Sequence, residues 1–454
     1  MPTPDAPRVD SHATAQPNVP GRRIVAGYGM RFWVLVALIG VCAGLGGGVA
    51  LKFLELVEHL VWGYKHGFLL GAIERTSALH RVVALALGGV IAGLGSLLLM
   101  RLKSGMEVSE ALWLRDGRMP LLPTIARAVD SLVAVGFGAS LGLEAAPQQI
   151  GASFASAASD WARLPTWQRR LLVASGAGAG MAAVYNMPLG GALFAVEVML
   201  GSITLPLVLP ALVMTVAATA SAWIVLGNVP TYFAPSFTVH ASQIVWAIIV
   251  GPLAGLVGVV WIRIVARAYA ARPKLPLRRA LAPPLVFTAL GLVAIKYPQL
   301  LGNGKSMVQI ALLGRLSIGL FAALLVLKPL MTGGAVGSGV PGGLFTPTLA
   351  IGTMLGGVAG SLWIHLWPGA SVGSYAFIGG AAMLGAAMQG PISAVVMVLE
   401  LAPGGTGVVV PIVIAVAGGT IVARIVGEHS IFAVRVAERW SDEGRPALES
   451  VLPE

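Results

Sequence analysis

Residues 142–151 read Gly-Leu-Glu-Ala-Ala-Pro-Gln-Gln-Ile-Gly and place one carboxylate, Glu144, in an otherwise uncharged apolar segment. The nearest acidic residues along the chain are Asp130 and Asp160. A charged group at bilayer depth is costly and persists chiefly where it faces a cavity, an ion path or a partner. The glycines and the proline predict a broken helix that begins near Ala145, whose free N–H groups and positive dipole end attract anions. We therefore expect Glu144 to be functional.

The composition is that of a polytopic membrane protein. Of the 454 residues, 56% are hydrophobic and only 11% are charged, and the mean hydropathy is +0.84. No Asp, Glu, Lys or Arg occurs between Val198 and Ile262 or from Pro329 to Leu399. A spanning helix needs about 20 apolar residues, so each of these runs holds more than one span. We predict an all-α membrane fold of many tilted and broken transmembrane helices, since glycine and proline interrupt the runs.

The formal charge of +11 indicates membrane topology rather than nucleic-acid binding, because the basic residues gather in short clusters between apolar runs. The positive-inside rule assigns such clusters, at 22–23, 163–170 and 267–279, to cytoplasmic loops. The single cysteine, Cys42, excludes an intrachain disulfide. Residues 1–30 lack the apolar core of a signal peptide and are expected to form a disordered cytoplasmic tail.

The chain repeats its plan in two halves. Residues 142–151 match 343–352 at an offset of 201, and residues 188–197 match 391–400 at an offset of 203. Interrupted hydrophobic segments at matching places in two halves point to a transport site at the repeat interface. We place the two transmembrane halves at 31–227 and 228–440, followed by a cytoplasmic tail at 441–454.

Helix N-termini are expected to meet at this interface. The sequence predicts them near Ser104, near Glu144 and near Phe345. Each would present N–H donors and a positive dipole end, which favours an anion as the transported species. A cation transporter should instead show carboxylates or carbonyl ends at its centre.

At these positions the sequence resembles the CLC family of chloride channels and chloride/proton antiporters. The motif Gly-x-Phe-x-Pro is intact at 343–347, Gly-Ser-Gly-Val-Pro-Gly precedes it at 337–342, and the block 176–197 also looks like the family. The resemblance extends from about residue 30 to residue 440. It implies an inverted repeat with one anion pathway per subunit of a homodimer. It also implies a plasma or inner membrane protein with both termini cytoplasmic.

The resemblance assigns roles to individual residues. Glu144 stands where the family has its gating glutamate, whose carboxylate competes with an anion until it is protonated. The family ascribes anion coordination to a serine in its first motif, to N–H groups around the phenylalanine of its third motif and to a late tyrosine. The residues expected to line the anion path are Ser104, Glu144, Ala145, Leu344, Phe345, Thr346 and Phe432.

The chain departs from the family pattern at four places. In the first motif, Ser104 aligns with the coordinating serine if one gap is allowed, and Lys103 aligns with it if no gap is allowed. We prefer Ser104, because a serine hydroxyl can donate a hydrogen bond to an anion. Lys103 would instead add a favourable positive charge at the inner mouth of the path. Residues 143–146 lack the arginine, second glycine and proline of the second motif. Phe432 replaces the tyrosine and can close the path but donates no hydrogen bond. Val198 replaces the glutamate that relays protons in antiporters.

We favour passive chloride conduction gated by Glu144, because Val198 cannot carry a proton. Chloride/proton antiport is the alternative, since water can replace a side-chain relay.

A membrane enzyme with Glu144 as general base would need a second catalytic group. An organic-solute transporter would need a wide cavity, whereas converging helix ends suit a small anion. We expect no metal, no cofactor and no nucleic-acid partner. Glu197 and Glu400 are interpreted as buried structural acceptors.

Overall fold

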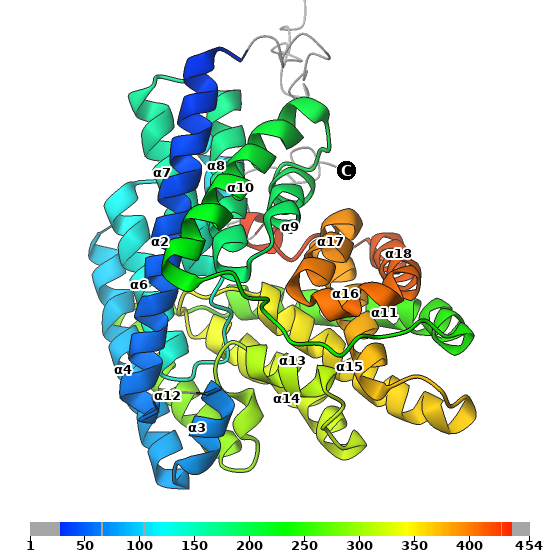
Figure 1. The fold of residues 1–454 in the computed structure, drawn as a ribbon. Coiled ribbons are helices and arrows are strands. Elements are labelled where there is room, and N and C mark those ends of the chain that lie inside the picture. Colours follow the sequence, from blue (N-terminus) through cyan, green and yellow to red (C-terminus); the bar gives the residue numbers. More distant parts are fainter. Residues whose placement is uncertain (1–27, 65–66, 103–105, 428, 438–454) are drawn as a thin grey trace, which may run out of the picture.

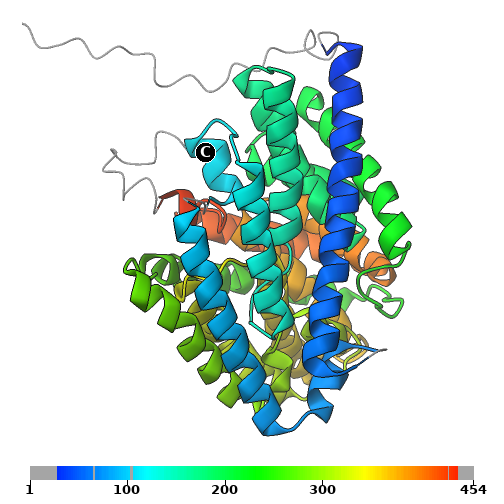
Figure 2. The same ribbon diagram turned by 90° about the vertical axis from the view of Figure 1, so that its left-hand side faces the viewer.

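The computed structural model describes residues 28–64, 67–102, 106–427 and 429–437. Within these ranges the regular structure is helical, and the long helix α2 runs the height of the molecule (Figures 1 and 2). Eight described helical segments are long and apolar enough to cross a membrane. They are Met30–Trp62 (α2), Ala78–Arg101 (α4), Leu205–Leu226 (α10), Ala241–Ala270 (α11), Pro276–Ala294 (α12), Ile318–Gly337 (α14), Phe345–Leu366 (α15) and Pro403–Ile425, which contains α18 (Val409–Ile425). The predicted all-α polytopic fold is confirmed.

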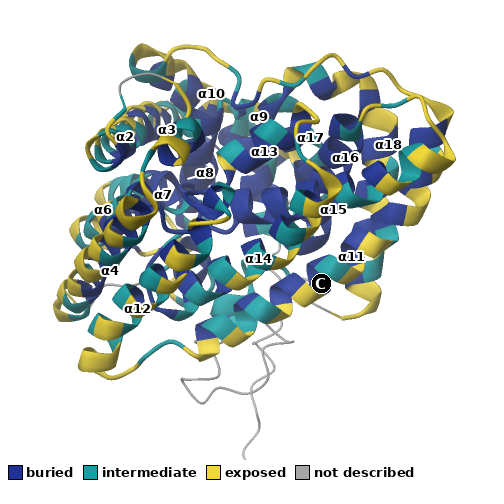
Figure 3. Ribbon diagram, turned by 90° about the horizontal axis from the view of Figure 1, so that it is seen from below, coloured by how far each residue is buried: buried dark blue, intermediate teal, exposed yellow. Residues whose placement is uncertain are grey.

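The remaining described helices differ in length, and several of them lie in the centre of the molecule (Figure 1). They are Leu69–Arg75 (α3), Val108–Leu114 (α5), Leu121–Gly136 (α6), Ala145–Trp161 (α7), Thr166–Tyr185 (α8), Pro188–Leu193 (α9), Lys305–Leu312 (α13), Val372–Met388 (α16) and Pro391–Leu401 (α17), with a π-helical turn at Phe194–Met199 (η1) and 3-10 turns at Pro298–Leu300 (η2) and Pro403–Val408 (η3). Helix α16 is buried from Gly373 to its end, and α8 is buried over most of its length from Leu171 onward. Figure 3 shows exposed residues along the outer helices and buried ones in the middle. The apolar outer faces suit contact with lipid.

Two apolar runs of the sequence are each divided into two helices. The run 306–331 breaks between α13 and α14, where Gly314 has a positive φ and Ser317 caps the next helix with its hydroxyl. The run 374–400 breaks between α16 and α17, where Gln389 adopts a left-handed conformation and Pro391 starts the new helix. Proline is well suited to the first turn of a helix and poorly to its interior. Each run therefore holds two helices, in agreement with the expectation that glycine and proline interrupt the apolar runs.

The same chain reversal occurs in the other half of the molecule. Asn186 ends α8 with φ 55°, and Pro188 begins α9 two residues later. Glu197 then accepts hydrogen bonds from two first-turn N–H groups of α17, at 3.1 and 2.6 Å. Glu400 accepts two such bonds from α9, also at 3.1 and 2.6 Å. Each carboxylate thus caps the helix of the opposite half, which agrees with the interpretation of both as structural acceptors.

Helices α7 and α8 cross closely because glycines face each other at the crossing. A Cβ atom at Gly176 would lie 2.5 Å from the carbonyl oxygen of Gly151, and a Cβ at Gly180 would collide with the carbonyl of Pro147. Small residues let membrane helices approach to backbone contact. This crossing fixes the position of the first turn of α7, which carries the candidate site.

We predict that Gly176→Ala lowers stability by about 1–3 kcal/mol, because the added methyl group overpacks the α7/α8 crossing. The apparent melting temperature of the detergent-solubilised protein, followed by size-exclusion chromatography after heating, measures this effect. The matched control is Gly319→Ala in α14, where an added Cβ meets nothing within 4 Å. The control should leave the melting temperature unchanged or raise it, since alanine favours helix. Equal responses of the two variants would contradict the packing argument.

Candidate functional site

Two helix N-termini meet at the centre of the molecule. Helix α7 begins at Ala145 and α15 begins at Phe345, as the sequence predicts. The segments that precede the two helices are paired through one antiparallel bridge. In this bridge Gly142 and Gly343 exchange N–H···O bonds of 2.8 Å. The two halves of the chain are therefore joined immediately before the two helix ends.

The Glu144 carboxylate lies against the N-terminus of α15 rather than that of its own helix. Its side chain is 1% exposed. Oε1 accepts hydrogen bonds from the backbone N–H groups of Phe345, at 2.6 Å, and Thr346, at 3.3 Å. A Cβ atom at Gly142 or Gly343 would collide with this carboxylate. The glycines thus make room for a negative charge at the positive end of a helix dipole.

The second carboxylate oxygen is held by two hydroxyl groups. Oε2 of Glu144 lies 3.1 Å from the Tyr185 hydroxyl and 3.1 Å from the Thr346 hydroxyl. The two hydroxyl oxygens are 2.6 Å apart. Thr346 was expected from the sequence to line the path, whereas Tyr185 was not. The available signal was a hydroxyl residue directly before Asn186-Met187-Pro188, inside the recognised block 176–197.

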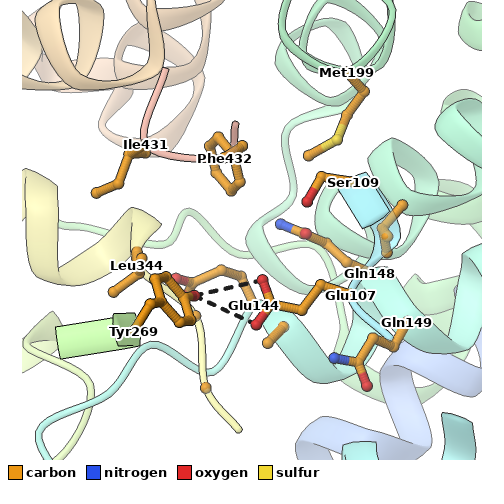
Figure 4. A pocket seen from close by; sticks show the side chains of 14 residues that line it. Glu107, Ser109, Glu144, Gln148, Gln149, Met199, Tyr269, Leu344, Ile431 and Phe432 are labelled. Carbon is orange, nitrogen blue, oxygen red and sulfur yellow. Dashed lines mark hydrogen bonds between the residues drawn. The ribbon is translucent and has the colours of Figure 1, made fainter. Parts of the chain in front are cut away.

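A narrow cavity of about 40 Å³ lies beside Glu144 (Figure 4). Its lining includes Ala145 from α7, Leu344 before α15, and Phe432 near the end of the described chain. Phe432 packs edge to face on Phe194, with ring centroids 5.3 Å apart. Further polar lining comes from Glu107, Ser109, Gln148 and Gln149.

The structure brings most of the predicted site residues together. Glu144 contacts Phe345 and Thr346 directly and shares the cavity with Ala145, Leu344 and Phe432. The positions of Lys103 and Ser104 lie outside the described residues. Val198 is half-buried on η1, and its side chain is directed toward Gly390 rather than into the cavity lining.

One expectation for the first motif is corrected. The sequence predicts a helix N-terminus near Ser104, but α5 begins at Val108 with Glu107 as its N-cap. Glu107 accepts a bond from the backbone of Glu110, and the Glu110 side chain accepts a 2.6 Å bond from the backbone N–H of Glu107. This reciprocal capping box satisfies the helix end without a hydroxyl.

The comparison with protein families agrees with this architecture. The family of voltage gated chloride channels matches residues 88–424. The chain belongs to this CLC family.

Individual CLC proteins match over nearly the whole chain. A voltage-gated ClC-type chloride channel ClcB of Salmonella typhimurium is 31% identical over 420 residues, covering 89% of this chain and 99% of that protein. An H(+)/Cl(-) exchange transporter ClcA of Vibrio parahaemolyticus is 27% identical over 418 residues, covering 88% of each. The solved structure of a slow cyanobacterial Cl-/H+ antiporter aligns with a TM-score of 0.80 at 22% identity, covering 92% of this chain and all of that one. This likeness establishes a CLC fold.

An ionic cluster borders the cavity of this CLC chain. Glu107 lies 3.2 Å from the Arg127 guanidinium and 3.3 Å from the Tyr269 hydroxyl. Arg435 lies 3.3 Å from Glu110 and 3.9 Å from Glu107. These contacts anchor the last described segment and so hold Phe432, three residues before Arg435, at the cavity.

A buried amine is a second polar group near the site that the sequence did not predict. Lys328 is fully buried in α14. Its ammonium donates to the Ser140 hydroxyl at 2.8 Å and to the Gly302 carbonyl at 3.2 Å. The signal was a lone lysine directly before the uncharged run from Pro329 to Leu399. When protonated, Lys328 adds positive potential near the anion-accepting helix ends.

The arginines lower the pKa of the Glu107 carboxyl, which precedes α5 and lies outside the membrane-spanning helices. Burial alone would raise this pKa, but the charges of Arg435, Arg127 and Arg272 outweigh it and hold the pKa below its ordinary value. A carboxyl with a lowered pKa in the folded state stabilises the fold above its unfolded pKa. That contribution is lost as the pH falls through the lowered folded pKa.

We predict that Glu107→Gln destabilises the protein by about 2 kcal/mol at neutral pH, because a largely buried Arg127 loses its counter-charge. The apparent melting temperatures of wild type and variant, measured from pH 8 to pH 3, should differ by a constant amount above about pH 4.3 and converge below it. Glu55→Gln is the control, since Glu55 pairs with Lys52 on the surface. A difference that is absent at pH 7, or that widens on acidification, would refute the assignment.

Proposed function

We propose that this chain transports chloride across a membrane and that the Glu144 carboxylate occupies the position through which the anion passes. The observation that carries the proposal is the pair of N–H bonds from the first turn of α15 to Glu144. Such a helix end binds an anion without needing a cationic side chain. The carboxylate and a chloride ion cannot both occupy it. Protonation of Glu144 removes the charge that competes with chloride.

Passive conduction is the mode that we propose. Val198 has no titratable group, and its side chain is directed toward Gly390 rather than into the cavity. Proton exchange is the second candidate because polar residues line the cavity beside Glu144 and could hold water molecules that conduct protons. The relatives described above include both a chloride channel and an exchange transporter.

Other classes of function fit the site less well. A cavity of about 40 Å³ accommodates a monatomic ion but not a sugar or an amino acid. An enzyme would need a second catalytic group beside Glu144, whereas the groups that contact its carboxylate are hydroxyl and N–H donors. We propose transport without a cofactor, in a plasma or inner membrane with both termini cytoplasmic. The family resemblance supports a homodimer with one pathway per subunit.

We predict that Glu144→Gln makes chloride flux independent of pH, because glutamine keeps the shape of the side chain but carries no charge at any pH. Wild-type flux should rise as the pH is lowered and the carboxylate becomes protonated. Chloride efflux from proteoliposomes, with potassium and valinomycin setting the voltage and external pH recorded, measures both flux and proton movement. Glu55→Gln, an exposed carboxylate variant, should behave as wild type.

The outcomes separate the candidates. Chloride efflux without proton movement supports passive conduction. Uphill proton movement coupled to chloride efflux would replace it by exchange, and no chloride flux from folded wild-type protein would contradict the proposed function. Flux that keeps its pH dependence in Glu144→Gln would contradict the gate assignment.

A further inference from the structure

The cavity lacks a hydroxyl donor at Phe432, but hydroxyls approach Glu144 from another direction. Tyr185, at the end of α8, is 2% exposed, and its ring packs against that of Phe345 with centroids 5.7 Å apart. Its backbone carbonyl accepts a 2.6 Å bond from the Thr231 hydroxyl. These contacts hold Tyr185 independently of Glu144. The Tyr185 hydroxyl therefore stays in place when the Glu144 side chain moves.

The number of hydroxyl protons limits which hydrogen bonds Tyr185 and Thr346 can donate. The three oxygens of Tyr185, Thr346 and Glu144 Oε2 make three contacts of 2.6, 3.1 and 3.1 Å. With Glu144 ionised, the two hydroxyls supply one proton each. If Tyr185 donates to Thr346, then Thr346 donates to the carboxylate; if Thr346 donates to Tyr185, then Tyr185 donates to the carboxylate. If neither hydroxyl donates to the other, both donate to the carboxylate. In every arrangement at least one hydroxyl proton is directed at the carboxylate.

Departure of the carboxylate leaves that donor without an acceptor. The two hydroxyls can keep their mutual bond, but the second proton then points at the vacated position. The N–H groups of Phe345 and Thr346 point there as well. A buried donor without a partner is costly, so the position is best filled by another acceptor. A monatomic anion can accept from all of these donors at once.

We propose that Tyr185, acting with Thr346, is an anion ligand that transfers its hydrogen bond from the Glu144 carboxylate to the transported anion. This inference rests on the proposed chloride transport and adds a specific side-chain ligand to it. The ligand class is a small monatomic anion, since the acceptor must fit the place of a carboxylate. Tyr185 supplies the phenol donor that the chain lacks at Phe432.

A different account is that the Tyr185 hydroxyl only holds Glu144 in place. The two accounts differ in a protein without the carboxylate. In a Glu144→Ala background a residue that only positions Glu144 has nothing left to position, whereas an anion ligand still contributes to chloride affinity. Chloride affinity in that background is therefore the decisive quantity.

The experiment is calorimetric titration of the purified full-length Glu144→Ala protein with chloride, alone and with a second substitution. Adding Tyr185→Phe, which removes only the hydroxyl, should weaken chloride binding roughly tenfold, the usual effect of losing a hydrogen bond to a charged group. Adding Thr346→Val should weaken it by a similar factor, because the two hydroxyls act as a pair. Tyr375→Phe is the control: that hydroxyl is buried and bonds Ser242 at 2.6 Å. It should leave the affinity unchanged.

Each outcome has a distinct meaning. Chloride binding by Glu144→Ala that Tyr185→Phe leaves unchanged overturns the inference and leaves the proposed transport standing. A loss confined to Thr346→Val, or an equal loss in Tyr375→Phe, also overturns the role of Tyr185. Absence of chloride binding by folded Glu144→Ala protein would overturn the inference and the proposed function together.

Discussion

A carboxylate held by the free N–H groups of another helix is the interaction on which the rest of the structure depends. Glu144 precedes α7 in the chain, yet its charge lies at the start of α15. The arrangement satisfies two groups that would otherwise be costly in a membrane interior, an ionised side chain and an open helix end. It also means that another anion can replace the carboxylate at this site. An interaction that stabilises a carboxylate in this place can stabilise any small anion there.

The surrounding structure permits this exchange because it keeps the backbones of the two halves close together and leaves little space around the carboxylate. Glycines at 142 and 343 allow the two halves to pair directly before the two helix ends. Glycines at the α7/α8 crossing set the position of the first turn of α7. Buried cations stand in both halves, Arg127 in α6 and Lys328 in α14, at the sequence offset of 201 that relates the repeats. Each half of the repeat therefore contributes a buried basic side chain as well as a helix N-terminus.

The architecture and the principal site could be predicted from the sequence because short stretches of residues indicate both. The starts of α7 and α15 follow from glycines and prolines beside apolar residues, and the lone Glu144 marks the site. The exact places of the breaks within 306–331 and 374–400 do not follow from composition, because they depend on the backbone conformation of Gly314 and Gln389. Tyr185 was missed because its hydroxyl reaches Glu144 only through the tertiary contact between the end of α8 and the start of α15. The boundaries of the two halves and the choice between Ser104 and Lys103 stay predictions.

The most direct test of the central claim is a crystal structure of the protein in bromide, with anomalous diffraction used to locate the ion, for wild type at neutral pH and for Glu144→Ala. The account predicts an anomalous peak in the variant within hydrogen-bonding distance of the Phe345 and Thr346 N–H groups. In wild type it predicts the carboxylate at that position and no peak there. A peak at that position in both proteins, or in neither, would contradict competition between Glu144 and the anion.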